Sequence, residues 1–346
     1  MTAAIEALRH SAAVTRMNHV HALRLSGPGS HALLDAATTS RLFARENQML
    51  QTLMLDAEGF PFADVFVCLE EDAWVVLAEG PTLPALRAHL ERVRATRTPD
   101  AEVQVTDLLE ENVLWSIDGP FAWEVTAGLL GPEVLGAPYL SFLTLKGVQC
   151  FRAGKTGEYG YLLLVPKASS EETWQRLLTL GKTLGLVEGN LAALDQCALE
   201  NWHFSIRALN GEALIPHELQ LQWRVDAKKE FEGVEALRKR VAESNVRLTC
   251  FVAAQAVTRG EVVTLDGAKV GTVLEVGFSS TRKDWVGWAV LDAAVAWPGI
   301  SKFRVGESSM RTCSPPMIDN RSLFVDQRKH SYRTRGEAEF PALVSR

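Results

Sequence analysis

The residues with the clearest chemical potential lie in a glycine-rich stretch, residues 154–161, which reads GKTGEYGY. One carboxylate, Glu158, stands between Gly157 and Gly160, and glycine lets a backbone turn where a larger residue would clash. A carboxylate on such a turn can accept two parallel N–H hydrogen bonds from one ligand. The same pattern is typical of an ordinary β-hairpin with a solvated glutamate, so the motif alone leaves both interpretations open.

Two histidine-containing segments could also take part in chemistry. The ordinary pKa of a histidine lies near neutrality, so His203 is a candidate general acid, or else an exposed loop residue. Its neighbour Trp202 either lines a substrate pocket or belongs to the core, where tryptophan is usually buried. His19 and His21 would share one face of a strand, but two histidines do not make a metal site, and we expect no bound metal.

Composition limits the functions that the chain can have. Its 346 residues are enough for about two domains, or three small ones. The net charge of −6, from 36 basic and 42 acidic residues, gives no electrostatic footprint for nucleic acid or an anionic membrane. The N-terminus lacks the apolar run of a signal peptide, and no stretch approaches the length of a transmembrane helix. Five scattered cysteines without a CxxC pair predict a reduced, cytoplasmic protein.

Two similar halves are predicted to position the candidate residues. Each opens with a strand, a Gly-Pro turn and a helix, at about residues 20–37 and again at 113–130. Further strands and a surface helix follow in each half, which predicts an α+β core with an internal duplication. In the second half, Ser169 and Glu172 have the spacing of a capping box and predict a helix start.

The last third of the chain has a different pattern. Short strands separated by glycine turns run from about residue 247 to 305 and predict a small barrel or sandwich. We therefore expect a core of two interleaved subdomains over residues 1–240, a β-barrel-like domain over 241–310, and an extended tail over 311–346.

The order of these motifs resembles the glycine-cleavage T-protein (aminomethyltransferase) family, from about residue 9 to 305. LSGPGSHALL at 25–34 is similar to the family's opening strand and helix, and residues 216–237 fit its "PxEAGLxWxVxxxKxxFIGxxAL" motif. Residues 156–161 match "TGExGYE" up to its last letter, which is Leu162 here. The resemblance implies a three-domain fold, with a duplicated α/β folate-binding core around a central cavity and a small C-terminal β-barrel.

Several positions depart from the family pattern. Ala63 stands where the family has the first, catalytic aspartate of an Asp-Asp pair, so only Asp64 remains. Leu194 and Ala198 replace two arginines, and Lys155 replaces a tyrosine. The scaffold is therefore expected to carry over more fully than the aminomethyl reaction.

The resemblance also implies roles for the candidate residues. Asp64 is expected to be a general acid or base beside the reacting nitrogen, or else a strand residue that faces water. Tyr161 either contacts the ligand ring or is core, and Arg282 either pairs with folate carboxylates or is solvated. The full set is Asp64 and His203 as catalytic residues, Glu158, Tyr161, Glu200 and Arg282 as cofactor contacts, and His19 and Trp202 at the substrate pocket.

The resulting hypothesis is a tetrahydrofolate-dependent methyltransferase, a demethylase that acts on a small O-, N- or S-methylated substrate. One alternative is a folate-binding protein without transferase activity, and another is an enzyme that kept the cavity and changed its ligand. Residues 229–233 contain no cysteine, which disfavours the iron–sulfur assembly branch of the superfamily. The sequence leaves open the methyl donor and whether the protein is a homo-oligomer.

Overall fold

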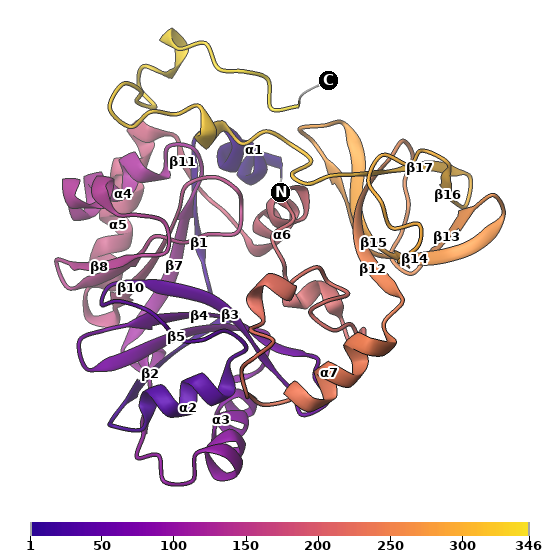
Figure 1. The fold of residues 1–346 in the computed structure, drawn as a ribbon. Helices are drawn as coiled ribbons and strands as arrows, with labels where there is room; N and C mark the ends of the chain where they lie inside the picture. The colour runs from indigo at the N-terminus through magenta and orange to yellow at the C-terminus, as the bar shows by residue number, and fades with distance from the viewer. Residues whose placement is uncertain (1, 345–346) are drawn as a thin grey trace.

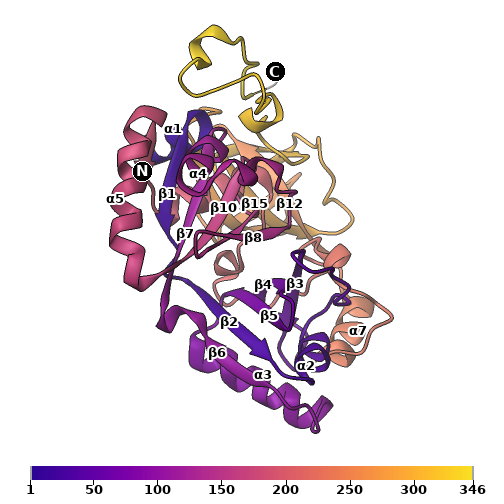
Figure 2. The same cartoon turned by 90° about the vertical axis from the view of Figure 1, so that its left-hand side faces the viewer.

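The first half of the chain forms a five-stranded antiparallel sheet that two helices cover on one face. In the computed structural model, which describes residues 2–344, its strand order is β3-β4-β5-β2-β6. The helices α2 (Ser30–Ala37) and α3 (Leu83–Arg97) lie along one side of this sheet (Figure 2). Alternate strand residues form an apolar cluster with these helices. The strands are β2 (Val20–Ser26), β3 (Met49–Leu55), β4 (Pro61–Leu69), β5 (Ala73–Glu79) and β6 (Gln104–Asp107).

The second half, together with β1 from the N-terminal segment, forms a six-stranded sheet in the order β11-β1-β7-β10-β9-β8. Its neighbouring strands are antiparallel except for β1 and β11, which are parallel. The helices α4 (Ala122–Leu130) and α5 (Lys167–Leu184) cover it and bury Trp115 and Trp174. The strands are β1 (Ala12–Arg16), β7 (Asn112–Asp118), β8 (Phe142–Leu145), β9 (Val148–Phe151), β10 (Gly160–Pro166) and β11 (Leu186–Glu188).

The two halves repeat one pattern and pack face to face. Each follows the order strand, helix, three strands, helix, which confirms the predicted α+β class and duplication. The faces that point away from the helices meet in a shared apolar cluster, to which Phe66 and Leu77 contribute from one sheet and Leu114 and Phe151 from the other. This arrangement places Asp64 of β4 on the inner face of one sheet and Asp118 of β7 on the inner face of the other.

Helices outside the sheets close the ends of this central layer. The helix α1 (Thr2–His10) packs against α6 (Leu191–Asn201), whose N-terminus is capped by the side chain of Asn190. The helix α7 (Val234–Glu243) lies in a cluster with apolar residues of β3 and of the barrel. Short 3-10 helices connect the elements at Leu108–Glu110, Pro132–Gly136, Ile206–Leu209 and Gln222–Arg224. Over residues 2–344, no helix is both long and apolar enough to cross a membrane.

The C-terminal β domain is a closed six-stranded barrel, as predicted (Figure 1). Its strand order is β12-β15-β14-β13-β16-β17, which leaves no free sheet edge. The strand β17 extends past the residues expected to be β, into the stretch that was predicted to be tail. The strands are β12 (Val246–Ala253), β13 (Val262–Leu265), β14 (Ala268–Ser279), β15 (Asp284–Asp292), β16 (Phe303–Val305) and β17 (Ser308–Cys313).

After the barrel, the chain returns to the second half of the core. Figure 1 shows this segment, residues 314–344, crossing from the barrel over α1 toward α4. It contains two short 3-10 helices, Arg321–Leu323 and Arg335–Glu337, and we call it the strap. Glu124 of α4 accepts hydrogen bonds from Ser331 and Tyr332, so the strap is held by polar contacts to the core.

Some local expectations were wrong. Ser169 does not cap a helix, because α5 already begins at Lys167, directly after Pro166. The helix α1 and the strand β1 were not expected at all, although both are well formed and largely buried.

Candidate functional site

A small cavity lies between the inner faces of the two sheets and is closed at one end by α6. Its volume is about 60 Å³. Most of its wall is apolar, including Met17, Phe66, Leu77 and Leu162. The polar and charged residues that line it are His19, Asp64, Glu79, Ser116, Asp118, Lys155, Thr156, Asp195, Ser205 and Arg207.

A chain of ion pairs crosses this cavity. Lys155 Nζ lies 2.7 Å from Asp64 Oδ2 and 2.6 Å from Glu79 Oε2. Arg207 contacts both Glu79 and Asp195. On the other side, Arg224 Nη1 lies 3.0 Å from Asp64 Oδ1. Three carboxylates are thus matched by three cations, so this cluster carries no net charge. The matched cations are Lys155, Arg207 and Arg224.

The alternation of β4 explains why Asp64 reaches the cavity. Ala63 points to the opposite face and belongs to the apolar cluster under α2 and α3. Asp64 lines the cavity and is almost completely buried. Burial opposes its ionisation, but the charges and hydrogen bonds of Lys155 and Arg224 outweigh burial and hold the pKa of Asp64 below its ordinary value. Asp64 is therefore an ionised carboxylate at neutral pH.

Asp118, the last residue of β7, is in the opposite situation. It lines the same cavity and is 2% exposed, and in the described part of the chain no cation lies within ion-pair distance of it. Thr156 Oγ1 donates a long hydrogen bond of 3.5 Å to Asp118 Oδ1. Burial raises the pKa of Asp118 to about 7, and nearby hydroxyls and Arg152 oppose this only in part. This carboxyl can hold or release a proton near neutral pH.

Ser116 lies on the same strand, two residues before Asp118. It lines the cavity, and its buried Oγ has no hydrogen-bond partner among residues 2–344. An unpaired hydroxyl in an apolar wall costs free energy, so it is a candidate to meet a polar atom of a ligand.

Only one of the two catalytic candidates lines the cavity. Asp64 lines the cavity, but His203 is not among the lining residues. The near-neutral pKa expected for His203 was wrong: burial, together with the charges of Lys155 and Arg224, lowers its pKa to about 4. The ring is therefore neutral at physiological pH and holds no titratable proton for a leaving group. A catalytic role for His203 stays a prediction, but a near-neutral pKa no longer supports it.

Of the two pocket candidates, the structure brings one into the cavity. His19 lines it, and burial and the charges of Arg207 and Lys155 lower the pKa of His19 to about 4. Trp202 lies elsewhere, with its ring edge-on to Trp288 of the barrel at a centroid distance of 5.7 Å.

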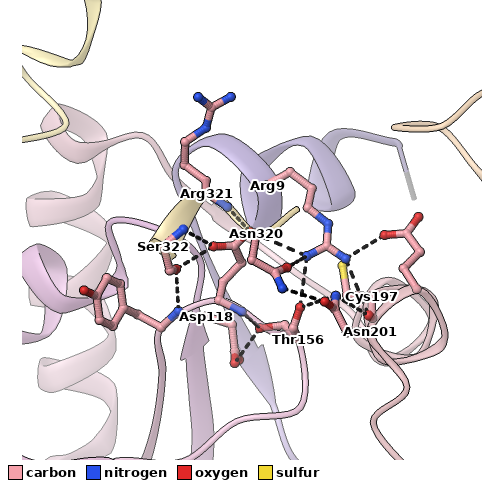
Figure 3. A network of polar contacts seen from close by, with 11 residues as sticks. Arg9, Asp118, Thr156, Cys197, Asn201, Asn320, Arg321 and Ser322 are labelled. Atoms are coloured by element: carbon pink, nitrogen blue, oxygen red, sulfur yellow. Dashed lines mark hydrogen bonds and ion pairs between the residues drawn. The ribbon is translucent and has the colours of Figure 1, made fainter. Parts of the chain in front are cut away.

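Glu158 faces the strap, away from the cavity. Its carboxylate accepts hydrogen bonds from the backbone N–H of Arg321, 3.0 Å, and from the N–H and Oγ of Ser322 (Figure 3). Arg9 Nη1 lies 3.7 Å from Glu158 Oε1. The protein itself therefore supplies the paired N–H donors that were expected from a ligand. Glu158 is not a free acceptor, contrary to the argument from its sequence motif.

Arg9 and Gly157 make this arrangement possible. The guanidinium of Arg9 is buried and lies 2.6 Å from Glu200, while it also donates to the Thr156 carbonyl and to Asn320 (Figure 3). Gly157 has φ +80°, and a Cβ there would come within 2.5 Å of the Asn201 side chain and 2.6 Å of that of Asn320. The glycine is thus required by the close approach of the strap.

The remaining cofactor candidates also have protein partners. Glu200 is fully buried with Arg9. Tyr161 is in the core of the second half, where burial raises its pKa and Arg152 lies 4.8 Å from its ring centroid. Arg282 Nη1 donates to the Met317 carbonyl at 2.6 Å, at the start of the strap. The structure does not bring these residues to the cavity, and ligand contacts for them stay predictions.

Sequence reasoning missed several cavity residues. Lys155 was noticed only as a replacement for tyrosine, yet it links two of the cavity's carboxylates. Asp118 ends an apolar strand directly before a Gly-Pro turn, and that carboxylate in an otherwise apolar strand was the available signal. Glu79 and Arg207 carried no motif, because only the fold brings them together.

Known proteins match the chain over most of its length. Residues 1–229 match a family model described as the GCVT N-terminal domain. The aminomethyltransferase of Frankia alni is 30% identical over 305 residues, which cover 84% of this chain and 81% of that protein. The aminomethyltransferase of Halothermothrix orenii is 26% identical over 309 residues, with 86% and 84% covered. In fold, the chain is similar to the crystal structure of glycine cleavage system aminomethyltransferase T from Bartonella henselae, with a TM-score of 0.77, 20% identity, and 90% of this chain and 88% of that chain covered.

Proposed function

Because this chain belongs to the GCVT family, to which its N-terminal 229 residues match, we propose that it is a tetrahydrofolate-dependent one-carbon transferase. Within that class, we propose a demethylase that moves a methyl group from a small methylated substrate to tetrahydrofolate. The observation that carries the proposal is the cavity between the duplicated halves, which two buried carboxyls line: Asp64, held by two cations, and Asp118, without an ion-pair partner in the described residues.

The cavity residues fit the polar edge of a pterin ring in their chemistry. Asp118 and the unpaired Ser116 Oγ offer acceptors and a donor on one wall, and apolar side chains surround them. The enclosed volume of about 60 Å³ is smaller than the ~150 Å³ cavity that holds a benzene ring. A bicyclic ring therefore requires a wall to move. Lys155 has a flexible stem and a side chain that is 20% exposed, so it is the wall with room to move.

The chain's own residues would contribute positioning and charge. Tetrahydrofolate is consumed as the methyl acceptor, so we treat it as a substrate that supplies a nucleophilic nitrogen. The apolar walls exclude water, and the charges of the buried Asp64 and Glu79 orient the polar groups of bound molecules. Holding two reactants in one closed space lowers the barrier chiefly by removing the entropy of their encounter.

Calorimetry with tetrahydrofolate tests the binding half of the proposal. Leu191 of α6 is a half-buried cavity residue, and Leu191→Trp should fill the space and weaken binding at least tenfold. Leu180→Trp is the matched control, since Leu180 is also half-buried on a helix but lies outside the cavity, and it should bind as the wild type does. Equal affinity of the two variants would place folate elsewhere, and no binding by the wild type would sink the proposal.

Turnover tests the transferase half. Incubation of the wild type with tetrahydrofolate and separate methyl ethers, methylamines and methyl sulfides should yield 5-methyltetrahydrofolate with at least one donor. Binding without any turnover would instead select a folate-binding protein without activity. The ion pairs that already engage Asp64 are the observation in favour of that second candidate. The proposal retains a cytoplasmic location, which the five unpaired cysteines support.

A further inference from the structure

The proposed methyl transfer requires a group that donates a proton to the leaving atom, and the cavity contains a candidate. When a methyl group leaves a neutral oxygen, the bonding electron pair stays on that oxygen, which must gain a proton. Asp64 cannot supply it at neutral pH, because Lys155 and Arg224 keep it ionised. His203 cannot supply it as an imidazolium, since its ring is neutral and lies outside the cavity lining.

Asp118, unlike His203, lines the cavity and, unlike Asp64, has no ion-pair partner among the described residues. It lies at the cavity end of β7, where the hydroxyls of Thr156, at 3.5 Å, and of Ser116 on the same strand favour its ionised form without outweighing burial. Two glycines make room for the carboxyl: a Cβ on Gly154 or Gly160 would come within 2.7 or 2.8 Å of Asp118 Oδ1. The local sequence therefore leaves this buried carboxyl in place without giving it a cation.

The titratable groups around Asp118 leave it protonated in part at neutral pH. From the segment after β9, the charge of Arg152 favours the ionised form, but this guanidinium donates to the Gly160 carbonyl at 2.8 Å. Two titratable groups come from α6. Burial raises the pKa of the Cys197 thiol to about 12, so it stays neutral. Burial also raises the pKa of Asp195, a cavity residue, to about 6, but this carboxylate is ion-paired with Arg207. The dominant influence on Asp118 is its burial.

The cavity also discriminates against a cationic methyl donor. Its carboxylates Asp64, Glu79 and Asp195 are all paired with internal cations. A sulfonium or quaternary ammonium is usually held by an aromatic cage or by an unpaired carboxylate, and Phe66 is the only Phe, Tyr or Trp that lines this cavity. An uncharged donor therefore suits the site better than a charged one.

We propose that Asp118 is the catalytic acid of the transfer and that the methyl donor is an uncharged compound such as a methyl ether; this inference rests on the proposed function. Asp118 donates its proton to the oxygen as the methyl–oxygen bond breaks with its electron pair on oxygen. The methyl carbon becomes bonded to the acceptor's secondary amine nitrogen, which sheds one proton. Asp118 takes up that proton, so the carboxyl is restored and the products are a hydroxyl compound and the N-methylated acceptor.

The test compares wild type, Asp118→Asn and Asp118→Glu in the full chain, with a simple methyl ether, the matching methyl sulfide and a methylsulfonium as donors. Asp118→Asn should lower turnover of the ether by about 10²–10⁴-fold, and Asp118→Glu should restore part of it. Wild-type ether turnover should fall tenfold per pH unit above about pH 7, where the acid form is lost. Turnover is measured at saturating tetrahydrofolate and folate affinity by calorimetry, and the fall in kcat should exceed the fall in affinity, because Asp118 also lines the proposed pterin wall.

A second readout does not depend on activity. The carboxyl carbon of Asp118, assigned by ¹³C NMR from its absence in Asp118→Asn, should titrate near pH 7. Asp107→Asn is the matched control, because Asp107 also ends a strand but lies outside the cavity, and it should leave turnover unchanged. Ether turnover that survives in Asp118→Asn, turnover of the sulfonium alone, or a carboxyl that titrates near pH 4 would overturn the role of Asp118 and leave the transferase proposal standing. Absence of folate binding and of all turnover would overturn both.

Discussion

Asp64 and Asp118 lie in one cavity, but their pKa values are shifted in opposite directions. Both are buried, and burial alone pushes each carboxyl toward its neutral form. Asp64 receives two cations at hydrogen-bond distance and stays ionised, whereas Asp118 receives none and keeps its proton to about pH 7. One cavity thus contains a fixed negative charge and a proton reservoir, the combination that acid–base chemistry requires.

Asp118 should make the stability of the protein depend on pH. Its pKa is about 7 when folded and 3.8 as the reference for the unfolded chain, so the folded state binds the extra proton between these values. The free energy of unfolding should therefore fall as pH rises from about 4 to 7, by at most ~4 kcal/mol. Asp118→Asn removes the titration and should be more stable than wild type at pH 8 but not at pH 4, as measured by urea unfolding. An unchanged difference between wild type and variant at the two pH values would contradict the burial argument.

At the scale of elements, the strap completes the core that it crosses. Glu158 and Arg9 would otherwise be buried charges with unsatisfied oxygens and N–H groups, which is costly. Backbone N–H groups of Arg321 and Ser322, and the side chain of Asn320, satisfy them. The strap has little regular structure of its own, so its order depends on these polar contacts.

Loss of the Glu158 carboxylate should therefore release the strap. Glu158→Ala removes the acceptor of three hydrogen bonds that Arg321 and Ser322 donate. Limited proteolysis should therefore cut within residues 314–344 several-fold faster in this variant than in the wild type. Glu171→Ala, an exposed site on α5, is the control and should leave the cleavage rate unchanged. Equal cleavage rates in both variants would mean that the apolar contacts of the strap are sufficient to hold it.

The elements themselves were predicted more reliably than their partners. The strand β3, for example, follows from the apolar residues Met49, Leu53 and Leu55 that it contains. The partners of Glu158 could not be predicted, because they are backbone N–H groups 163 and 164 residues away, which carry no side-chain signature. Asp64 was found because a motif resemblance pointed to it, whereas Glu79 and Arg207 meet it through the fold alone.

At the scale of the whole molecule, the barrel docks onto the C-terminal end of α6. Trp202, in a left-handed conformation after α6, packs edge-on against Trp288 of β15. Gly277 of β14 lies so close to α6 that a Cβ would come within 2.1 Å of the Gln196 side chain. The same helix lines the cavity, so α6 connects the barrel to the candidate site.

Trp202→Ala should loosen the barrel from the core. Trp202 is only partly buried, so its truncation should cost less than the ~3–5 kcal/mol of a fully buried tryptophan, and the loss falls on the contact between the two parts. Hydrogen exchange should quicken in β14, β15 and the end of α6 before it quickens in the strands β4 and β5. Trp297→Ala, at a residue 57% exposed on the barrel, is the control and should change little. Uniform acceleration over the whole molecule would argue instead that the two parts unfold as one unit.

The contact between Arg9 and Asn320 also bears on how the protein is made. The two residues are 311 positions apart, yet they hydrogen-bond in the same buried network. A ribosome that adds about 5–20 residues per second needs roughly 15–60 s to synthesise the intervening chain. During that time α1 carries an arginine whose final amide partner does not yet exist. Closure of this charged core therefore follows the synthesis of Asn320, and the nascent chain must keep its first helix out of wrong associations until Asn320 has left the exit tunnel.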